Sequence, residues 1–226
     1  MDVPLIQVTD LHRHFRMGRE TVRALDGVTL AVRRGEFWGI SGPSGSGKST
    51  LLYLLGGLDH PTSGSIRVEG NEITTLDENG LAAFRRRRVG FVYQMFNLIP
   101  TMTALQNVEF PMLFARVPVA QRRARARELL ERVGLGDRVG HRPTELSGGQ
   151  QQRVAVARSL VNSPDILLAD EPTGNLDSRS GADIMGLLRD LNDEGRTIIL
   201  VSHDPAVIAA TGRHMRLYDG RIQDEE

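Results

Sequence analysis

The chain has 226 residues, 40% of them apolar, which is enough to bury a sizeable core in one large domain or in one domain with an inserted subdomain. Its 28 basic and 28 acidic residues give zero formal net charge, so no bulk attraction to nucleic acid or to an anionic membrane is expected. The absence of cysteine excludes disulfides and thiolate metal sites. The N-terminus does not resemble a leader, and no apolar run approaches the roughly 20 residues of a membrane span. We therefore expect a soluble, intracellular chain that reaches a membrane only through a partner.

Short apolar runs predict a small β layer at the N-terminus. Residues 5–8 and 28–32 are expected to form strands. Between them, residues 11–18 carry two histidines and the aromatic Phe15, a residue type that is more often core than ligand contact. Residues 37–40 predict a buried strand that leads directly into a glycine-rich loop.

That loop, residues 42–50 with the sequence GPSGSGKST, fits the phosphate-binding pattern of glycine, four free positions, glycine, lysine and serine or threonine. A helix is predicted after it, over residues 50–55. The glycines allow successive N–H groups to point into one concavity, which the positive end of the helix dipole also faces. We predict a polyphosphate site in which Lys48 reaches the terminal phosphates and Ser49 ligates magnesium. An ordinary flexible glycine turn is the alternative, and it does not account for the flanking strand and helix.

Composition supports this assignment, because Lys48 is the only lysine among 28 basic residues. A compact ammonium group fits between phosphate oxygens better than the broad guanidinium fork of arginine. Arginine-biased codon usage explains the arginines but not this exception.

The next segment predicts a short strand over residues 65–68 and a helix capped by Asp77. The helix ends in the arginine run 85–88, which we interpret as a solvated face. Residues 89–93 predict another buried strand, and Gln94 follows it. Because α/β sheets present ligands at the ends of their strands, Gln94 is a candidate contact to nucleotide or water.

From residue 101 to about 143 the composition changes to helical periodicity with several proline and glycine breaks, which predicts an inserted helical subdomain. The basic segment 121–132 could meet lipid head groups, although a solvated helix face is the simpler account.

Residues 146–153, LSGGQQQR, precede a helix predicted over 154–161. Ser147 and Gln150 have the spacing of a capping box, so the simplest interpretation is a well-capped helix. The two adjacent glycines cost backbone entropy unless something approaches the main chain closely, which indicates a second anion site at a helix N-terminus. Such a site either binds a different anion or closes over a nucleotide that another copy of the chain holds.

An apolar strand at residues 166–169 ends in Asp170 and Glu171. Asp170 would hold magnesium through water, and Glu171 would orient and deprotonate an attacking water. The alternative is that both acids merely cap the following loop. In that case the phosphate loop would lack the acidic residues that usually accompany it.

The C-terminal part predicts a helix after Asp177, a buried strand at 197–201 and a terminal hairpin at 215–222. The strand would bring His203 to the same sheet edge as the acids, where it could bond a γ-phosphate.

Taken together, the motifs resemble those of the nucleotide-binding subunit of an ATP-binding-cassette (ABC) transporter over nearly the whole chain, from about residue 5 to residue 222. LSGGQ at 146–150 is that family's signature, in the family's order with Gln94, the acids 170–171, Asp177 and His203. The resemblance implies an α/β fold with a P-loop NTPase core, a mostly parallel sheet, a small N-terminal antiparallel β layer and an inserted α-helical subdomain. It implies a single domain over 1–226, in which 1–100 and 162–226 form the β layer and core and about 101–161 form the helical subdomain.

The resemblance also implies ATP and Mg²⁺ as cofactors and a head-to-tail dimer of two identical chains that sandwiches two ATP molecules. Each ATP would lie between one chain's phosphate loop and the other chain's Ser147 and Gly149. The implied catalytic residues are Glu171, His203, Gln94 and Lys48, and the implied metal ligands are Ser49, Gln94 and Asp170. The implied ATP contacts are Phe15, Gly42, Ser44, Gly45, Gly47, Lys48, Ser49, Thr50, Ser147, Gly149 and Asp177.

Within that family, residues 58–64, 94–100 and 174–178 look like those of lipoprotein-releasing and macrolide-exporter ATPases. One departure is Phe15, where the family usually has a base-stacking tyrosine, so stacking should survive without a hydroxyl contact. We expect an ATPase at the inner face of the cell membrane, held there by a separate permease, with no nucleic-acid partner. Two alternatives are a soluble ABC ATPase of DNA repair or translation, which would need a coiled-coil insertion or a second cassette, and a structural ATPase of the cell-division type.

Overall fold

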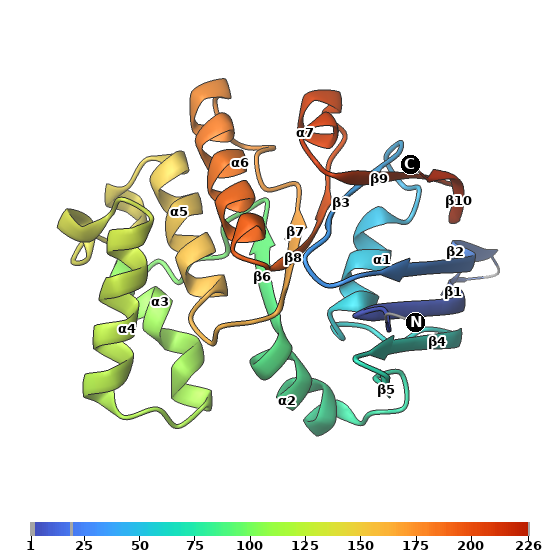
Figure 1. The fold of residues 1–226 in the computed structure, drawn as a ribbon, viewed down its shortest axis with the longest axis horizontal. Helices are drawn as coiled ribbons and strands as arrows, with labels where there is room; N and C mark the ends of the chain where they lie inside the picture. The colour runs from blue at the N-terminus through green and yellow to red at the C-terminus, as the bar shows by residue number, and fades with distance from the viewer. Residues whose placement is uncertain (1–2, 19, 226) are drawn as a thin grey trace.

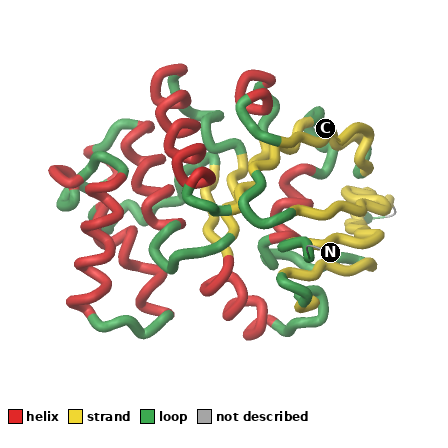
Figure 2. Tube along the Cα trace, in the orientation of Figure 1, coloured by secondary structure: helices red, strands yellow, loops and turns green. Residues whose placement is uncertain are grey.

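The computed structural model describes residues 3–18 and 20–225, which form two sheets and a group of helices (Figure 1). In Figure 2 several helices gather on one side of the molecule, and most strands lie on the other side together with one helix. None of the helices in the described residues is both long and apolar enough to cross a membrane.

The first sheet is the expected antiparallel layer, and its four strands are ordered β2-β1-β4-β5. Its strands are β1 (Ile6–Met17), β2 (Glu20–Val32), β4 (Ser63–Val68) and β5 (Asn71–Glu72). β1 and β2 are far longer than the strands predicted at 5–8 and 28–32, because the polar segment between those runs folds into a continuous hairpin. Backbone pairing stabilises this hairpin even where the side chains carry no apolar alternation.

The second sheet has six strands in the order β10-β9-β3-β8-β7-β6, and all neighbours are parallel except β9 and β10. Its strands are β3 (Phe37–Ser41), β6 (Val89–Tyr93), β7 (Ile166–Asp170), β8 (Thr197–Val201), β9 (Arg213–Tyr218) and β10 (Arg221–Glu225). Parallel pairing brings the carboxyl ends of β3, β6, β7 and β8 to one edge, where the loops carrying the predicted site residues begin.

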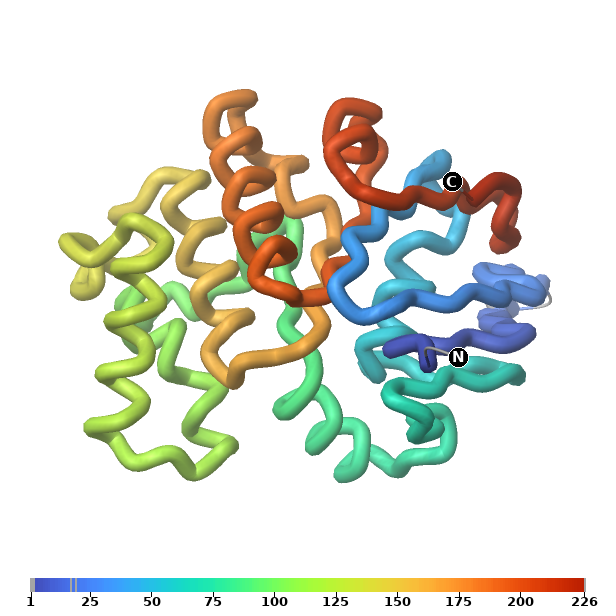
Figure 3. Tube along the Cα trace, viewed as in Figure 1, coloured from blue at the N-terminus to red at the C-terminus, as the bar shows by residue number. Residues whose placement is uncertain are grey.

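The helices pack on both faces of this sheet and along its β6 edge (Figure 3). They are α1 (Lys48–Leu55), α2 (Glu78–Arg88), α3 (Ala104–Phe114), α4 (Val119–Arg132), α5 (Gly148–Ser159), α6 (Ser178–Asp193) and α7 (Pro205–Ala209), with 3₁₀ turns at Gly136–Arg138 and Pro143–Glu145. Two helices begin earlier than predicted. α1 begins at Lys48 instead of residue 50, and α5 begins at Gly148 instead of residue 154, directly after the Ser147 cap.

Two buried clusters meet at the parallel sheet, because successive strand residues point to opposite faces. Leu167 and Ala169 of β7 join helices α3 to α6 in one cluster. Ile166 and Leu168 join α1 and the antiparallel layer in the other. The helical segment thus shares its apolar core with one sheet face, and its boundaries at about 101 and 161 stay a prediction.

Candidate functional site

The glycine-rich loop joins β3 to α1 and lines a cavity of about 630 Å³. Two positions of this loop require glycine for two reasons. The backbone there has a positive φ angle, and a Cβ atom would collide with a neighbouring strand. A Cβ atom at Gly42 (φ 146°) would lie 2.1 Å from the Leu217 carbonyl oxygen, and one at Gly47 (φ 101°) would lie 2.1 Å from that of Ala24. The loop is therefore held closely between β9 and β2, in a conformation that only glycine permits at these two positions. The cavity is lined by Ala24, Gly42, Pro43, Ser44, Gly45, Ser46, Gly47, Lys48, Ser49, Thr50, Glu171, Val201 and His203.

Lys48 begins α1 and is only 8% exposed. Its Nζ donates hydrogen bonds to the carbonyl oxygens of Gly42 and Pro43, both at 2.8 Å. Burial lowers the pKa of Lys48, and the nearby carboxylates of Glu171 and Asp170 oppose that shift. The loop thus holds a cation at the cavity wall, close to two acids.

Asp170, the last residue of β7, contacts two side chains of α1. Ser49 Oγ donates to Asp170 Oδ1 at 2.9 Å, and the Tyr53 hydroxyl donates to Asp170 Oδ2 at 2.8 Å. Burial, followed by the hydrogen bond to Asp170, raises the pKa of Tyr53 to about 12. Hydroxyl and carboxylate oxygens are the ligand types that Mg²⁺ prefers, so the donor set of Ser49 and Asp170 suits that ion.

Glu171 lies one residue beyond the strand, with a left-handed backbone (φ 48°) that turns its side chain into the cavity lining. Its N–H donates to the Val201 carbonyl oxygen at 3.0 Å, which fixes it beside the end of β8. His203 follows β8, and its Nδ1 lies 2.9 Å from Glu171 Oε1. That hydrogen bond, together with the charge of Glu171, raises the pKa of His203. An acid and an imidazole therefore face the same cavity as Lys48.

Gln94 and Phe15 do not line this cavity. Gln94 follows β6 and packs against the turn after Glu171, since a Cβ atom at Gly174 would lie 2.8 Å from its Nε2. Phe15 lies on β1 and is 37% exposed, with the guanidinium carbon of Arg13 4.3 Å from its ring centroid.

The signature residues are also outside the cavity. Ser147 caps α5 through a reciprocal pair, in which Gln150 N–H donates to Ser147 Oγ at 3.3 Å and Ser147 N–H donates to Gln150 Oε1 at 2.9 Å. Asp177 caps α6 by accepting from the Ser180 N–H at 2.9 Å, and the hydrogen bonds from Ser180 lower its pKa. The predicted capping box at Ser147 is thus confirmed, while the signature and the phosphate loop are separate within one chain.

Two side chains near the site were not predicted from the sequence. Tyr53 shares a helix face with Ser49, four residues earlier, and that spacing was the available signal. Gln152 is fully buried in α5 and donates from Nε2 to the carbonyl oxygens of Pro172 at 2.7 Å and Tyr93 at 3.3 Å. Gln152 therefore connects the signature helix to the loop after Glu171. A glutamine within a helix is not a recognisable motif, so the sequence did not predict this contact.

Comparison with known proteins agrees with this geometry. The family model described as ABC transporter matches residues 25–174, which include the phosphate loop, the signature and both acids. The chain belongs to the ABC transporter family, and it is an ATP-binding, ATP-hydrolysing cassette of that family.

Among its relatives is an uncharacterized ABC transporter ATP-binding protein of Thermotoga maritima, 50% identical over 98% of this chain and 95% of the relative. The macrolide export ATP-binding/permease protein MacB 1/2 of Paracoccus denitrificans is 52% identical over 97% of this chain but only 33% of its own length. The chain thus spans about a third of that relative. A dimeric structure of the ATP-binding cassette MJ0796 in a post-hydrolysis state, bound to ADP and Pi, superposes with a TM-score of 0.91 at 45% identity, covering 98% of this chain and 97% of the other.

Proposed function

We propose that two copies of this chain close head to tail over two ATP molecules and that hydrolysis reopens them to drive a membrane permease. The observation that carries the proposal is the separation of Ser147 and Gly149 from the cavity around Lys48. One chain therefore supplies half of each composite site, and a second copy completes it. The dimeric form of the similar cassette MJ0796 supports this arrangement.

In each composite site, the loop glycines, Ser44 and Thr50 would bind the phosphates through N–H groups, together with Lys48. Ser49 and Asp170 would hold Mg²⁺, with Gln94 joining them after closure; Mg²⁺ neutralises phosphate charge during transfer. Phe15 would stack on the base. The proposed contribution of the partner copy is Ser147, Gly149 and Asp177.

Hydrolysis needs an activated water. The Glu171 carboxylate faces the cavity, so it would accept the proton of the attacking water. The hydrogen bond to His203 at 2.9 Å fixes the orientation of the Glu171 carboxylate. In the proposed complex, the imidazole would lie beside the phosphate that leaves.

A surface between α2 and α3 suits the permease. Phe114 at the end of α3 is 64% exposed and borders a cleft of about 560 Å³. Arg86 of α2 donates from Nη1 to the Phe114 carbonyl oxygen at 3.4 Å, which joins the two helices at the cleft. An exposed aromatic ringed by arginines has the composition of an interface hot spot. The cleft is lined by Arg86, Arg87, Phe114, Ala115, Arg116 and Asn162.

The test is co-purification in detergent with a co-expressed membrane permease from the same source, followed by ATPase assay of the complex. We expect a stable complex whose turnover exceeds that of the isolated chain. Phe114→Asp should lose the complex while retaining ATP-dependent dimerisation. Leu58→Asp, which changes an apolar residue 43% exposed outside the cleft, is the matched control and should keep both. Equal retention of the complex by both variants would contradict the docking surface.

A further inference from the structure

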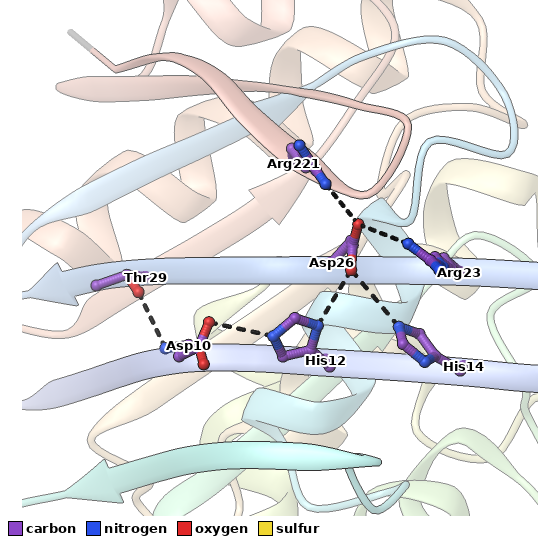
Figure 4. A network of polar contacts seen from close by, with 7 residues as sticks. All are labelled: Asp10, His12, His14, Arg23, Asp26, Thr29 and Arg221. Carbon is purple, nitrogen blue, oxygen red and sulfur yellow. Dashed lines mark hydrogen bonds and ion pairs between the residues drawn. The ribbon is translucent and has the colours of Figure 1, made fainter.

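A cluster of histidines and acids lies on the β1–β2 hairpin, outside the cavity described above (Figure 4). His12 and His14 are two residues apart on β1, so both side chains emerge on the same face of the sheet. Asp26 lies directly opposite His12 on β2. The three side chains are partly buried, with 23%, 27% and 13% of their surfaces exposed.

Three irregularities occur in the β1–β2 pairing around this cluster, the third of them between Arg13 and His14. The register shifts between Val8 and Leu11, where Asp10 has a left-handed backbone (φ 46°), and again between Leu11 and His12, opposite Gly27 (φ 87°). β-Bulges of this kind re-aim side chains and occur often beside functional sites. Here they bring the Asp10 carboxylate to the far side of the His12 ring, with Asp10 Oδ1 3.1 Å from His12 Nε2.

The ligand atoms are spaced as in a metal site. His12 Nδ1 lies 3.2 Å and His14 Nε2 lies 3.7 Å from the same oxygen, Asp26 Oδ1, and the three atoms lie within 4.8 Å of one another. A tetrahedral zinc site with bonds of about 2.0 Å spaces its ligand atoms about 3.3 Å apart. The distances of the two ring nitrogens from Asp26 Oδ1 are close to this spacing, and the three atoms, within 4.8 Å of one another, would draw together around a bound ion.

The hydrogen bonding around the His12 and His14 rings also favours a bound metal ion. His14 Nε2 is buried and has no hydrogen-bond partner, although it faces a carboxylate. Since Asp10 only accepts hydrogen bonds, His12 Nε2–H donates to it. His12 Nδ1 also lies within hydrogen-bond distance of Asp26 Oδ1, at 3.2 Å, and a metal ion bound by both atoms would replace that hydrogen bond.

The neighbouring arginines contact the Asp26 carboxylate at Oδ2, which leaves Oδ1 facing the two histidines. Arg221 and Arg23 both contact the other oxygen, Asp26 Oδ2, at 2.7 Å and 3.6 Å. The hydrogen bond from Arg221 to Oδ2 holds the Asp26 carboxylate in a fixed orientation. A carboxylate oriented by a hydrogen bond on its second oxygen is the usual arrangement around a bound metal.

We propose that His12, His14 and Asp26 bind a divalent transition-metal ion of the Zn²⁺ type, with Asp10 orienting the His12 ring. Two imidazole nitrogens and one carboxylate oxygen favour Zn²⁺ over Mg²⁺, which prefers oxygen ligands. Three protein ligands leave a fourth position for water. The proposed metal site is distinct from the oxygen-lined pair of Ser49 and Asp170.

The site is connected to the nucleotide cavity through the backbone. Asp26 N–H donates to the Gly220 carbonyl oxygen at 2.9 Å, and Gly220 N–H donates to that of Ser46 in the phosphate loop at 3.1 Å. A bound ion would therefore brace the hairpin that carries Phe15 and Ala24. This consequence is measurable as an increase in thermal stability, because a ligand that binds only the folded state stabilises it.

The test is titration of metal-free, nucleotide-free protein with ZnCl₂ by calorimetry, in excess Mg²⁺ to occupy oxygen-lined sites. We expect one tight Zn²⁺ per chain and a higher Tm with Zn²⁺ than with EDTA. His14→Gln should weaken the affinity roughly a hundredfold or more, and Asp10→Asn about 10–100-fold, the usual effect of an outer partner. His60→Gln, which alters an exposed histidine outside the cluster, is the matched control and should bind normally.

Folding is checked separately by measuring the Tm of each variant in EDTA, where His14→Gln should match the wild type. Tetrahedral coordination should appear as intense visible absorption when Co²⁺ replaces Zn²⁺. Unchanged Zn²⁺ affinity in His14→Gln would overturn the proposal. So would loss of the tight site in His203→Gln with retention in His14→Gln, since the ion would then bind at the Glu171–His203 pair.

Discussion

Gly149 in the first turn of α5 lies directly against Ser180 in the first turn of α6. A Cβ atom at position 149 would be 2.7 Å from Ser180 Oγ and 3.0 Å from Ser180 Cβ. The adjacent Gly148 has space, since its nearest contact would be Leu176 Cδ2 at 3.6 Å. The second glycine of the signature is therefore required by helix packing within the chain, independently of any ligand that approaches it.

We expect Gly149→Ala to lower the free energy of unfolding by about 1–3 kcal/mol, the usual cost of inserting a methyl group into a packed contact. Gly148→Ala is the matched control and should be neutral or slightly stabilising, because alanine favours the helix. Urea denaturation of both variants measures the difference. Equal stability of the two would show that the α5–α6 contact relaxes freely.

Glu171→Gln should keep ATP binding while lowering hydrolysis about 10²–10⁴-fold, the usual worth of a positioned general base. The carboxamide keeps the shape of the side chain but cannot take a proton from water. ATP should then trap a dimer, which gel filtration detects, while a phosphate-release assay measures turnover. Near-normal hydrolysis would remove Glu171 from this role.

The Glu171–His203 pair also predicts a pH dependence. Because Glu171 raises the pKa of His203 in the folded protein, its ordinary value being 6.5, the pair stabilises the fold fully below about pH 6.5. That stabilisation is lost as the pH rises through the folded-state pKa. NMR titration should show His203 titrating higher in the wild type than in Glu171→Gln, with His203→Gln identifying the signal. The same His203 pKa in both proteins would contradict the pairing.

Lys48→Arg should bind ATP nearly as poorly as Lys48→Ala, although it keeps the charge. The Lys48 ammonium lies between two carbonyl oxygens of its own loop, a position that suits a compact group on a thin stem. Equilibrium binding of a fluorescent ATP analogue measures the effect, and circular dichroism checks that both variants fold. Wild-type affinity in Lys48→Arg would contradict the argument from the single lysine.

Ser147→Arg should spare ATP binding by the monomer and abolish dimerisation, because the arginine fills the space proposed for the partner's phosphate. Loss of the cap alone costs about 1 kcal/mol, and Ser147→Ala controls for it without filling that space. Mixing Ser147→Arg chains with Lys48→Ala chains gives a sharper test, since each pair can form one complete site. Gel filtration with ATP and magnesium should show a mixed dimer although neither variant dimerises alone. Absence of the mixed dimer, where wild-type chains dimerise, would refute the head-to-tail arrangement.

The sequence by itself determined the elements whose signal is local. The phosphate loop, the strand ending in Asp170 and Glu171, and the Ser147 capping box each depend on a few consecutive residues. The contact of Ser49 with Asp170, 121 residues apart, was predictable as well, because parallel strands deliver their ends to one sheet edge.

Only the tertiary structure decided the contacts that depend on register and helix placement. The bulges that bring His12 and His14 to Asp26 lie in a segment without apolar alternation, so no periodicity in the sequence marks the pairing. The Gly149–Ser180 contact and the burial of Gln152 follow from how α5 packs against α6 and the loop after Glu171. Such contacts are set by the summed packing of a whole core, which no short stretch of sequence encodes.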